Sequence, residues 1–233
     1  VSRLSTKTYQ NQIQLVHQLA PNLFASTQWS SFLAHAKTDF YDTLKAQWYG
    51  AQNSSIKWIR NSWKAQAGFR SLTSDNPKLW ALPYFNLKRS LGKHFSANFL
   101  VERSARFPTM NELYWNPGGN RDLDPMRSWK KELAVRYSNK GWQFQQVFYR
   151  SVIESYIEWV PGPSSYFIVS QQRYVAARGA ESHLSYGSSR GAWKYKINGI
   201  DNNTRAISGR VFSPLNPQRI FVPEHSGALT LTL

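Results

Sequence analysis

The sequence predicts an all-β fold, an antiparallel up-and-down β-barrel that crosses a membrane. Apolar and polar side chains alternate with a period of two along most of the chain, which is typical of strands with one apolar and one polar face. Short polar turns alternate with long connections rich in proline, glycine and aromatic residues. Aromatic residues make up 15% of the chain and gather near the ends of the expected strands, where a membrane barrel has its interfacial girdles.

About eleven antiparallel strands are expected from the alternation. It is clearest from Trp193 to Asn198, where rings and an aliphatic side chain take one face while two lysines and an asparagine take the other. The expected strands comprise residues 7–19, 23–36, 41–50, 63–71, 80–91, 94–105, 128–138, 142–157, 171–187, 192–204 and 223–233. Residues 50–62 fit the alternation least well, and no stretch shows the 3.6-residue apolar spacing of an amphipathic helix.

Individual strands and connections have local support. Residues 95–102, 132–137 and 228–233 alternate clearly, and residues 143–153 are rich in β-forming side chains although they alternate less cleanly. Tight turns are expected at 20–22, 91–93, 138–141 and 188–191, and long loops at 71–80, 106–127, 159–170 and 206–223. Short turns at one end and long loops at the other indicate an up-and-down meander.

The polarity of the two faces favours a membrane barrel over a soluble one. A soluble sandwich or barrel packs its apolar face inward, whereas a membrane barrel turns it outward to lipid and lines its lumen with polar side chains. Here the apolar faces are rich in rings, and the opposite faces carry Gln, Lys, Arg and Glu. A soluble all-β module that binds a carbohydrate or an anionic ligand is the alternative.

Composition excludes several classes of function. The net charge of +16 favours anionic partners, but the cations are spread along every segment, which indicates a solvated face or lining ahead of a nucleic-acid patch. The chain has no cysteine, and its five histidines lack the spacing of a metal site. There is no nucleophile elbow, no phosphate-binding glycine loop and no apolar run long enough for a membrane helix. We therefore predict no enzyme, no cofactor, no metal site and no nucleic-acid partner.

The loop within residues 103–125 is the most specific stretch. Pro108 fixes its own φ and steers the preceding residue to an extended conformation. Residues 117–120 (PGGN) are expected to reverse the chain through positions with positive φ. Glu112 and Glu132 are expected to pair, at the base of the loop, with the neighbouring arginines at positions 103, 106 and 127.

Several motifs here resemble the signature of TonB-dependent outer-membrane receptors. They are RFPTMNELYW at 106–115, GNRDLDP at 119–125, SWKKEL at 128–133, FYR at 148–150 with Ile153, and RGAE at 178–181. The resemblance spans about residues 63–233, and the spacing between the motifs also fits. The sequence departs from the family pattern at Ala105, Arg121, Met126 and Ala134.

The resemblance implies about half of a 22-stranded barrel that an N-terminal plug closes, with residues 1–233 as a single barrel segment in which no plug is seen. It places the protein in the outer membrane of a Gram-negative bacterium. It implies energised uptake of a ferric siderophore, haem, cobalamin or a glycan. The implied partners are the plug and remaining strands of the same receptor, a TonB-type periplasmic energy-coupling protein, and outer-membrane lipid with lipopolysaccharide. A passive porin-like channel is the alternative function.

A ligand vestibule is expected at Arg106, Tyr114, Trp115, Arg121 and Arg127. Rings of this kind stack on a ligand, and guanidinium groups attract an anionic chelate. In the alternative interpretation the rings belong to an interfacial girdle, and the arginines contact lipopolysaccharide phosphates or pair with Glu and Asp.

Overall fold

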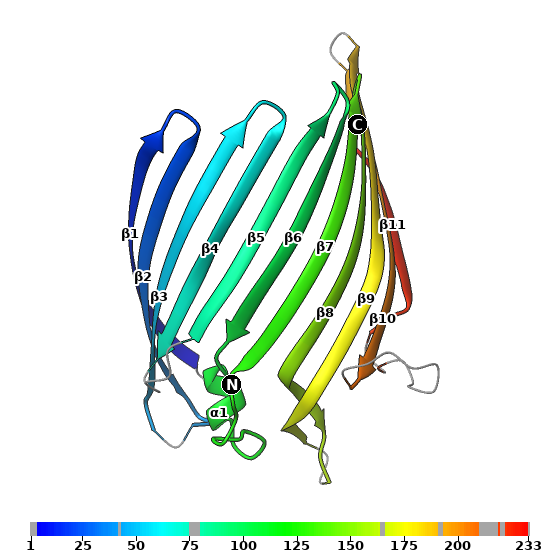
Figure 1. Cartoon of the computed structure of the whole chain (residues 1–233). Coiled ribbons are helices and arrows are strands. Elements are labelled where there is room, and N and C mark those ends of the chain that lie inside the picture. The colour runs from blue at the N-terminus through cyan, green and yellow to red at the C-terminus, as the bar shows by residue number, and fades with distance from the viewer. Residues whose placement is uncertain are drawn as a thin grey trace.

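The computed structural model describes residues 4–41, 43–74, 80–163, 166–190, 193–209, 219 and 222–232. Within them the chain forms one antiparallel sheet of 11 strands, and each strand pairs with its neighbours in the sequence (Figure 1). The sheet curves into part of a barrel wall with β1 at one edge and β11 at the other. The predicted all-β, up-and-down architecture is confirmed, as a partial barrel that is not closed over the described residues.

One short helix and eleven long strands make up the wall. They are β1 (Leu4–Ala20), β2 (Leu23–Thr38), β3 (Lys45–Arg60), β4 (Trp63–Ser74), β5 (Trp80–Leu91), β6 (Phe95–Arg106), α1 (Met110–Tyr114), β7 (Met126–Asn139), β8 (Trp142–Pro161), β9 (Phe167–Arg190), β10 (Trp193–Ser208) and β11 (His225–Thr232). No helix among the described residues is long and apolar enough to span a membrane.

Short turns join the strands at the end of the sheet that is uppermost in Figure 1. The turns predicted at 20–22, 91–93 and 138–141 lie where expected. Gly141 has a φ of 86°, and a side chain there would lie 2.2 Å from the carbonyl oxygen of Gly187, so only glycine fits. The turn predicted at 188–191 begins later because β9 continues to residue 190, and it includes residues outside those described.

Strand β3 differs from the sequence-based prediction. The alternation predicts a strand over residues 41–50, whereas β3 covers Lys45–Arg60. In its middle, Asn53, Ser54 and Ser55 place polar side chains on both faces, so the contrast between an apolar and a polar face is lost there. Hydrogen bonds across the sheet stabilise this part of the strand, for example between Thr27 Oγ1 and Ser54 Oγ at 2.9 Å.

The outer face of the sheet carries a continuous row of apolar side chains. Its members are register partners, one from each of β2 to β8: Leu23, Trp58, Ala65, Leu87, Phe99, Leu133 and Phe148. We call these seven residues the outer belt. Phe148 is 52% exposed and Leu133 is 45% exposed. A wall of exposed apolar side chains is what contact with lipid requires.

The inner face of the sheet is polar. Gln66 Nε2 donates hydrogen bonds to Ser55 Oγ at 3.1 Å and to Tyr84 Oη at 3.3 Å, which links β3, β4 and β5. In β7, Lys130 Nζ lies 2.6 Å from Glu132 Oε2. Polar side chains that bind one another along this face are typical of a barrel lumen.

Candidate functional site

The loop between β6 and β7, residues 107–125, folds back toward β3 at the end of the sheet that bears the long loops. Phe107 stacks on Tyr49 with ring centroids 5.4 Å apart. Gln47 Nε2 donates a hydrogen bond to the carbonyl oxygen of Pro108 at 2.9 Å. Because β4 and β5 separate β3 from β6, the loop must pass over the inner face of these two strands.

The middle of this loop rests on the connection between β2 and β3. Trp115 stacks on Phe40 with ring centroids 4.1 Å apart. Tyr41 Oη donates a hydrogen bond to Asn111 Oδ1, and the Asn116 N–H donates to the Phe40 carbonyl oxygen at 3.1 Å. Burial raises the pKa of the Tyr41 phenol, which favours its protonated, donating form. The loop is therefore anchored at both its start and its middle.

Arg106 and Glu112 form a bidentate ion pair at the base of the loop. Arg106 Nη1 lies 2.8 Å from Glu112 Oε2, and Arg106 Nη2 lies 2.9 Å from Glu112 Oε1. The Glu112 carboxylate also accepts a hydrogen bond from the Thr109 N–H at 2.7 Å, while Thr109 Oγ1 accepts one from the Glu112 N–H. This capping box explains why α1 begins here, and it is a local motif that the sequence analysis missed.

The same contacts set the charge of the Glu112 carboxyl. Burial raises its pKa, but the hydrogen bonds from Arg106 and Thr109 and the charge of Arg106 outweigh burial and lower the pKa below 4.5. Glu112 is therefore ionised at neutral pH and holds the arginine in place.

Two other predicted residues lie away from this ion pair. Glu132 lies within β7 on the inner face, where it contacts Lys130 instead of an arginine. Arg127 Nη2 lies 3.2 Å from Glu154 Oε2 on β8, and its guanidinium lies 4.9 Å from the ring centroid of Trp80. The expected pairing of Glu132 with an arginine at the loop base is thus replaced by a pair within one strand.

A small apolar core lies between the loop and the adjoining ends of the strands. It comprises the buried Leu123, Ile157 and Val169, with Leu113, Met126 and Trp159 packed against them. These side chains come from the loop, from β7 and from the ends of β8 and β9 that bear the long loops. The core fixes the loop by burial of apolar surface, in addition to the hydrogen bonds.

Residues 117–120 reverse the chain in a different way from the one predicted. None of them has a positive φ. Gly118 is needed for a close approach instead, because a Cβ atom there would lie 2.0 Å from the carbonyl oxygen of Phe167. The carbonyl oxygen of Gly118 accepts a hydrogen bond from the Val169 N–H at 2.8 Å, which connects the loop to β9.

We expect Gly118→Ala to detach the loop from β9. The added methyl group would collide with a backbone oxygen that cannot move independently of β9, so the hydrogen bond to Val169 would be lost at a cost of roughly 1–3 kcal/mol. Hydrogen exchange in the whole receptor should show faster exchange of the Val169 amide. Gly199→Ala is the control, since its Cβ would lie 3.9 Å from the nearest atom. Equal exchange in the two variants would contradict this role of Gly118.

Tyr114 contacts two cations, Lys45 and Arg121, and we call these three residues the rim. Lys45 Nζ is 4.9 Å from its ring centroid, and the guanidinium carbon of Arg121 is 5.6 Å from it. Arg121 is exposed, so its charge faces the space outside the loop. The structure thus brings together two of the predicted residues and adds Lys45, which the sequence analysis did not indicate.

Two hollows lie against the same loop. An aromatic hollow of about 390 Å³ is lined by Asn111, Trp115, Pro117, Trp159, Tyr166 and Phe167. A second hollow of about 410 Å³ lies under the loop, and its lining includes Tyr49, Arg70, Arg106, Phe107 and Thr109. We call the rim and these two hollows the loop cluster. It combines flat aromatic surfaces with cationic side chains, a combination that suits planar anions.

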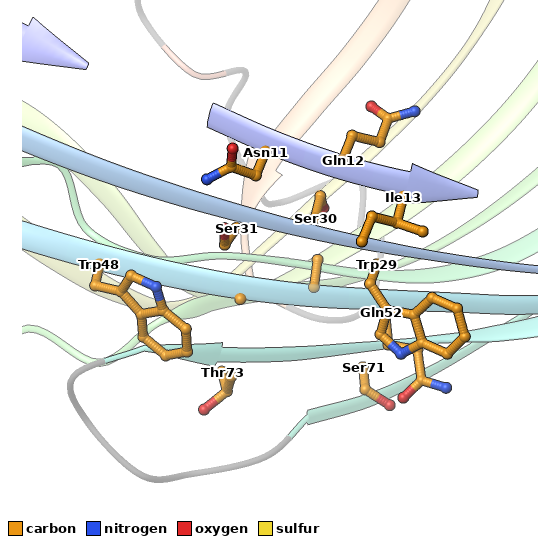
Figure 2. A pocket seen from close by; sticks show the side chains of 12 residues that line it. Asn11, Gln12, Ile13, Trp29, Ser30, Ser31, Trp48, Gln52, Ser71 and Thr73 are labelled. Atoms are coloured by element: carbon orange, nitrogen blue, oxygen red, sulfur yellow. The ribbon is translucent and has the colours of Figure 1, made fainter. Parts of the chain in front are cut away.

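A third depression lies on the outer face and is separate from the loop cluster. Figure 2 shows Trp29 and Trp48 on either side of the small side chains of Ser31 and Thr73. Its volume is about 320 Å³. The ring of Trp48 lies over Gly50, where a Cβ atom would be only 2.9 Å from it. Because this groove opens toward the lipid side, it does not belong to a ligand path through the barrel.

No local motif of the sequence indicates the part of the site that the β2–β3 connection contributes. Phe40, Tyr41 and Lys45 contact a loop about 70 residues later in the chain, and only the run of aromatic residues near position 40 hinted at them. No group of three or more His, Cys, Asp or Glu residues that could hold a metal ion occurs among the described residues.

Sequence comparisons agree with this architecture. The family profile described as "TonB dependent receptor-like, beta-barrel" matches residues 4–233. The vitamin B12 transporter BtuB of Vibrio vulnificus (strain YJ016) is 31% identical over 107 residues, which cover 45% of this chain and 17% of that protein.

Solved structures share the fold. The siderophore receptor PirA from Pseudomonas aeruginosa superimposes with a TM-score of 0.68 at 15% identity, over 88% of this chain and 43% of that one. The hemophore receptor HasR from Serratia marcescens gives a TM-score of 0.69 at 14% identity, over 99% of this chain and 49% of that one. The chain spans less than half the length of each of these proteins. The profile match and the shared fold show that the chain belongs to the TonB-dependent receptor family, as part of a β-barrel in the outer membrane of a Gram-negative bacterium.

Proposed function

We propose that the chain forms part of the wall of a plugged barrel that takes up a small anionic chelate in an energised step. The observation that carries this proposal is the loop cluster on the inner side of the wall. A loop that merely joined two strands would not need a bidentate ion pair, a capping box and a buried apolar core to fix it. Such preorganisation lowers the entropic cost of binding a ligand.

The chemistry of the loop cluster supports a planar anionic ligand. Lys45 and Arg121 place positive charge at the rim beside the ring of Tyr114. Trp115 and Trp159 offer flat aromatic surfaces in the adjoining hollow. A metal chelate with aromatic or conjugated donor groups would stack on these rings while its negative charge meets the cations.

The polar inner wall supports passage of a polar cargo past a plug. Lys130 and Glu132 of β7 and Gln66 of β4 present charged and amide groups to the lumen. A plug and the remaining strands of the same receptor would complete this lumen, and a TonB-type periplasmic protein would supply the energy. The names of related proteins mention vitamin B12, a siderophore and a hemophore with heme, which gives a short panel of cargo to test.

The uptake experiment uses the whole receptor in cells that lack their own uptake of each cargo. Radiolabelled cyanocobalamin, haemin and a ferric tricatecholate are offered in turn, with and without a protonophore. We expect saturable uptake of one of them that the protonophore abolishes. Uptake that continues after the protonophore is added would instead indicate a passive channel.

We expect the double variant Tyr114→Ala/Arg121→Gln to weaken cargo binding by roughly tenfold or more, because it removes a stacking surface and a cation from the rim. The measurement is equilibrium binding of the transported cargo to whole cells. Lys140→Gln, in a turn at the opposite end of the sheet, removes the same charge without touching the loop cluster and serves as the control. Unchanged binding in the double variant would overturn the role given to this rim.

A further inference from the structure

Charge is divided unequally among the strands of the wall. Strands β1 to β5 contain no aspartate or glutamate. The acidic residues of this half of the chain stand in the connections that follow β2 and β4: Asp39, Asp42 and Asp75. Strands β6, β7 and β9, by contrast, each place a glutamate on the inner face: Glu102, Glu132 and Glu181. The described inner wall therefore has one part without carboxylates and one part that carries several.

Three lysines lie together on the inner face of the part without carboxylates. Gln66 of β4 faces the lumen, and residues two apart on a strand share a face, so Lys64 does too. Lys88 of β5 is the register partner of Lys64, and Lys57 of β3 is the register partner of Gln66. All three lysines are exposed. We call them the lysine site.

The positive charge of the lysine site is not balanced within the described wall. Lys64 and Lys88 are directly opposite each other, and like charges in this arrangement destabilise a sheet. None of the three lysines forms an ion pair with an acidic residue in the described part of the chain. Glu132 is separated from Lys88 by the whole of β6, and it already contacts Lys130. An anion in the lumen would relieve this repulsion.

The lysine site lies at the end of the barrel opposite the loop cluster. Lys64 is the second residue of β4, and Lys88 lies three residues before Leu91, where β5 ends. Both positions are near the short turns that are uppermost in Figure 1. Short turns of an outer-membrane barrel face the periplasm, whereas its long loops are extracellular. The site is therefore on the periplasmic side of the lumen.

Further cations on the same strands connect the loop cluster with the lysine site. Lys45, the first residue of β3, belongs to the rim. Arg70 of β4 lines the hollow under the loop and shares the inner face with Lys64, six residues away, or about 20 Å along the strand. An anion that moves along β3, β4 and β5 thus meets positive charge at the entrance, beneath the loop and at the periplasmic end. Along β6 to β9 it would meet the three glutamates of the inner face.

We propose that an anionic chelate leaves the loop cluster along the inner face of β3, β4 and β5, and that the lysine site is its last binding site before the periplasm. Ammonium groups on flexible stems bind carboxylate or catecholate oxygens without a fixed geometry, which suits a site that must also release its ligand. The inference rests on the proposed function. It adds the side of the lumen along which the plug must open, and the residues that the cargo contacts last.

The first test measures the charge of the two parts of the inner wall without any cargo. The chain has no cysteine, so Ser90→Cys, two residues from Lys88, and Ala134→Cys, two residues from Glu132, introduce single thiols on the inner face. The whole receptor in outer-membrane vesicles is treated with anionic sulfonatoethyl methanethiosulfonate or with cationic trimethylammonioethyl methanethiosulfonate. We expect Ser90→Cys to react about tenfold faster with the anionic reagent, and Ala134→Cys to lack this preference. Adding Lys64→Gln/Lys88→Gln should reduce the preference at Ser90→Cys to below about threefold.

The second test separates passage through the barrel from binding at the loops. Cells with the whole receptor are given radiolabelled ferric tricatecholate or haemin, the anionic cargoes of the panel. We expect Lys64→Gln/Lys88→Gln to lower the maximal rate of energised uptake about tenfold, and to change binding at the cell surface by less than about twofold. Arg60→Gln/Arg89→Gln is the matched control, because it removes two charges near the same end of β3 and β5 but on the outer face, two residues from Trp58 and Leu87. The control should change uptake by less than about twofold.

The outcomes distinguish this path from the proposed function. If wild type and Lys64→Gln/Lys88→Gln take up cargo equally fast, the path is wrong and the proposed function stands. If wild type shows no energised uptake, the proposed function fails and the path fails with it. Equal reagent preferences at Ser90→Cys and Ala134→Cys would also overturn the path. If the double variant admits vancomycin, the lysines hold an acidic face of the plug instead of cargo. Heat-dependent migration in gels checks folding, and Lys88→Gln alone replaces the double variant if that does not fold.

Discussion

Replacing Leu133 by arginine is expected to lower the free energy of unfolding of the intact receptor in a lipid bilayer by about 2–4 kcal/mol. Leu133 is 45% exposed on the outer face, and its register partners are Phe99 and Phe148. It lies six residues from Asn139 at the turn end of β7, which is about 20 Å of tilted strand and therefore near the middle of an apolar band about 25 Å tall. A guanidinium group at this depth loses hydration that no neighbouring side chain replaces.

A matched substitution on the inner face separates membrane contact from general damage to the sheet. Leu100 of β6 is the register partner of Glu132, so Leu100→Arg places the same new charge beside a carboxylate on the polar face. We expect Leu100→Arg to cost less than about 1 kcal/mol, measured by reversible unfolding in the same bilayer. Equal costs at the two positions would mean that the outer face does not meet hydrocarbon.

Much of this wall could be predicted from the sequence because a strand's two faces are a local property. Wherever one face is apolar and the other polar, as in residues 95–102 and 132–137, the period of two reveals the strand. The middle of β3 lacks this contrast, since the short polar residues Ser54 and Ser55 occupy both faces there. Pairing with β2 and β4 determines its conformation, and that information lies elsewhere in the chain.

The loop cluster could be predicted only where the residues in contact are close together in the sequence. Arg106 and Glu112 are six residues apart, and this short separation predicts that they interact. Phe40 and Lys45 reach the loop only because the barrel wall curves. No local sequence pattern therefore predicts their contacts with the loop. Gly118 illustrates a third case: the sequence predicts a chain reversal there, but the glycine is required by the nearby backbone of β9, which the sequence does not place beside it.

Replacing Glu112 by glutamine is expected to loosen the whole of residues 107–125. Glu112 is 8% exposed and receives hydrogen bonds from Arg106 and Thr109, which its charge strengthens. Glutamine keeps the size of the side chain but removes that charge. We expect a local loss of roughly 2 kcal/mol, below the value for a fully buried pair because the Arg106 side chain is 43% exposed. Hydrogen-exchange protection factors across the loop are the measurement.

The pH dependence of the loop distinguishes the charge of Glu112 from its shape. Because folding lowers the Glu112 pKa below 4.5, its contribution to stability is complete above about pH 4.5 and is lost as the pH falls through the lower, folded pKa. Wild-type protection factors should therefore fall toward those of Glu112→Gln in acid, while the variant changes little. Asp122→Asn, at an exposed position in the same loop, should behave like wild type.

A loop in Glu112→Gln that keeps its wild-type protection at neutral pH would show that the apolar core around Leu123 holds the loop without the ion pair. That core and the stacked rings bury apolar surface at any pH, whereas the ion pair acts only while the carboxylate is charged. The two contributions also differ in what they fix. Apolar packing holds the loop against the wall, but the two hydrogen bonds between Arg106 and Glu112 fix the direction in which α1 leaves β6. Loss of the pair with the core intact should therefore move Tyr114 relative to Lys45 before the loop detaches, and cargo binding should fall before protection factors do.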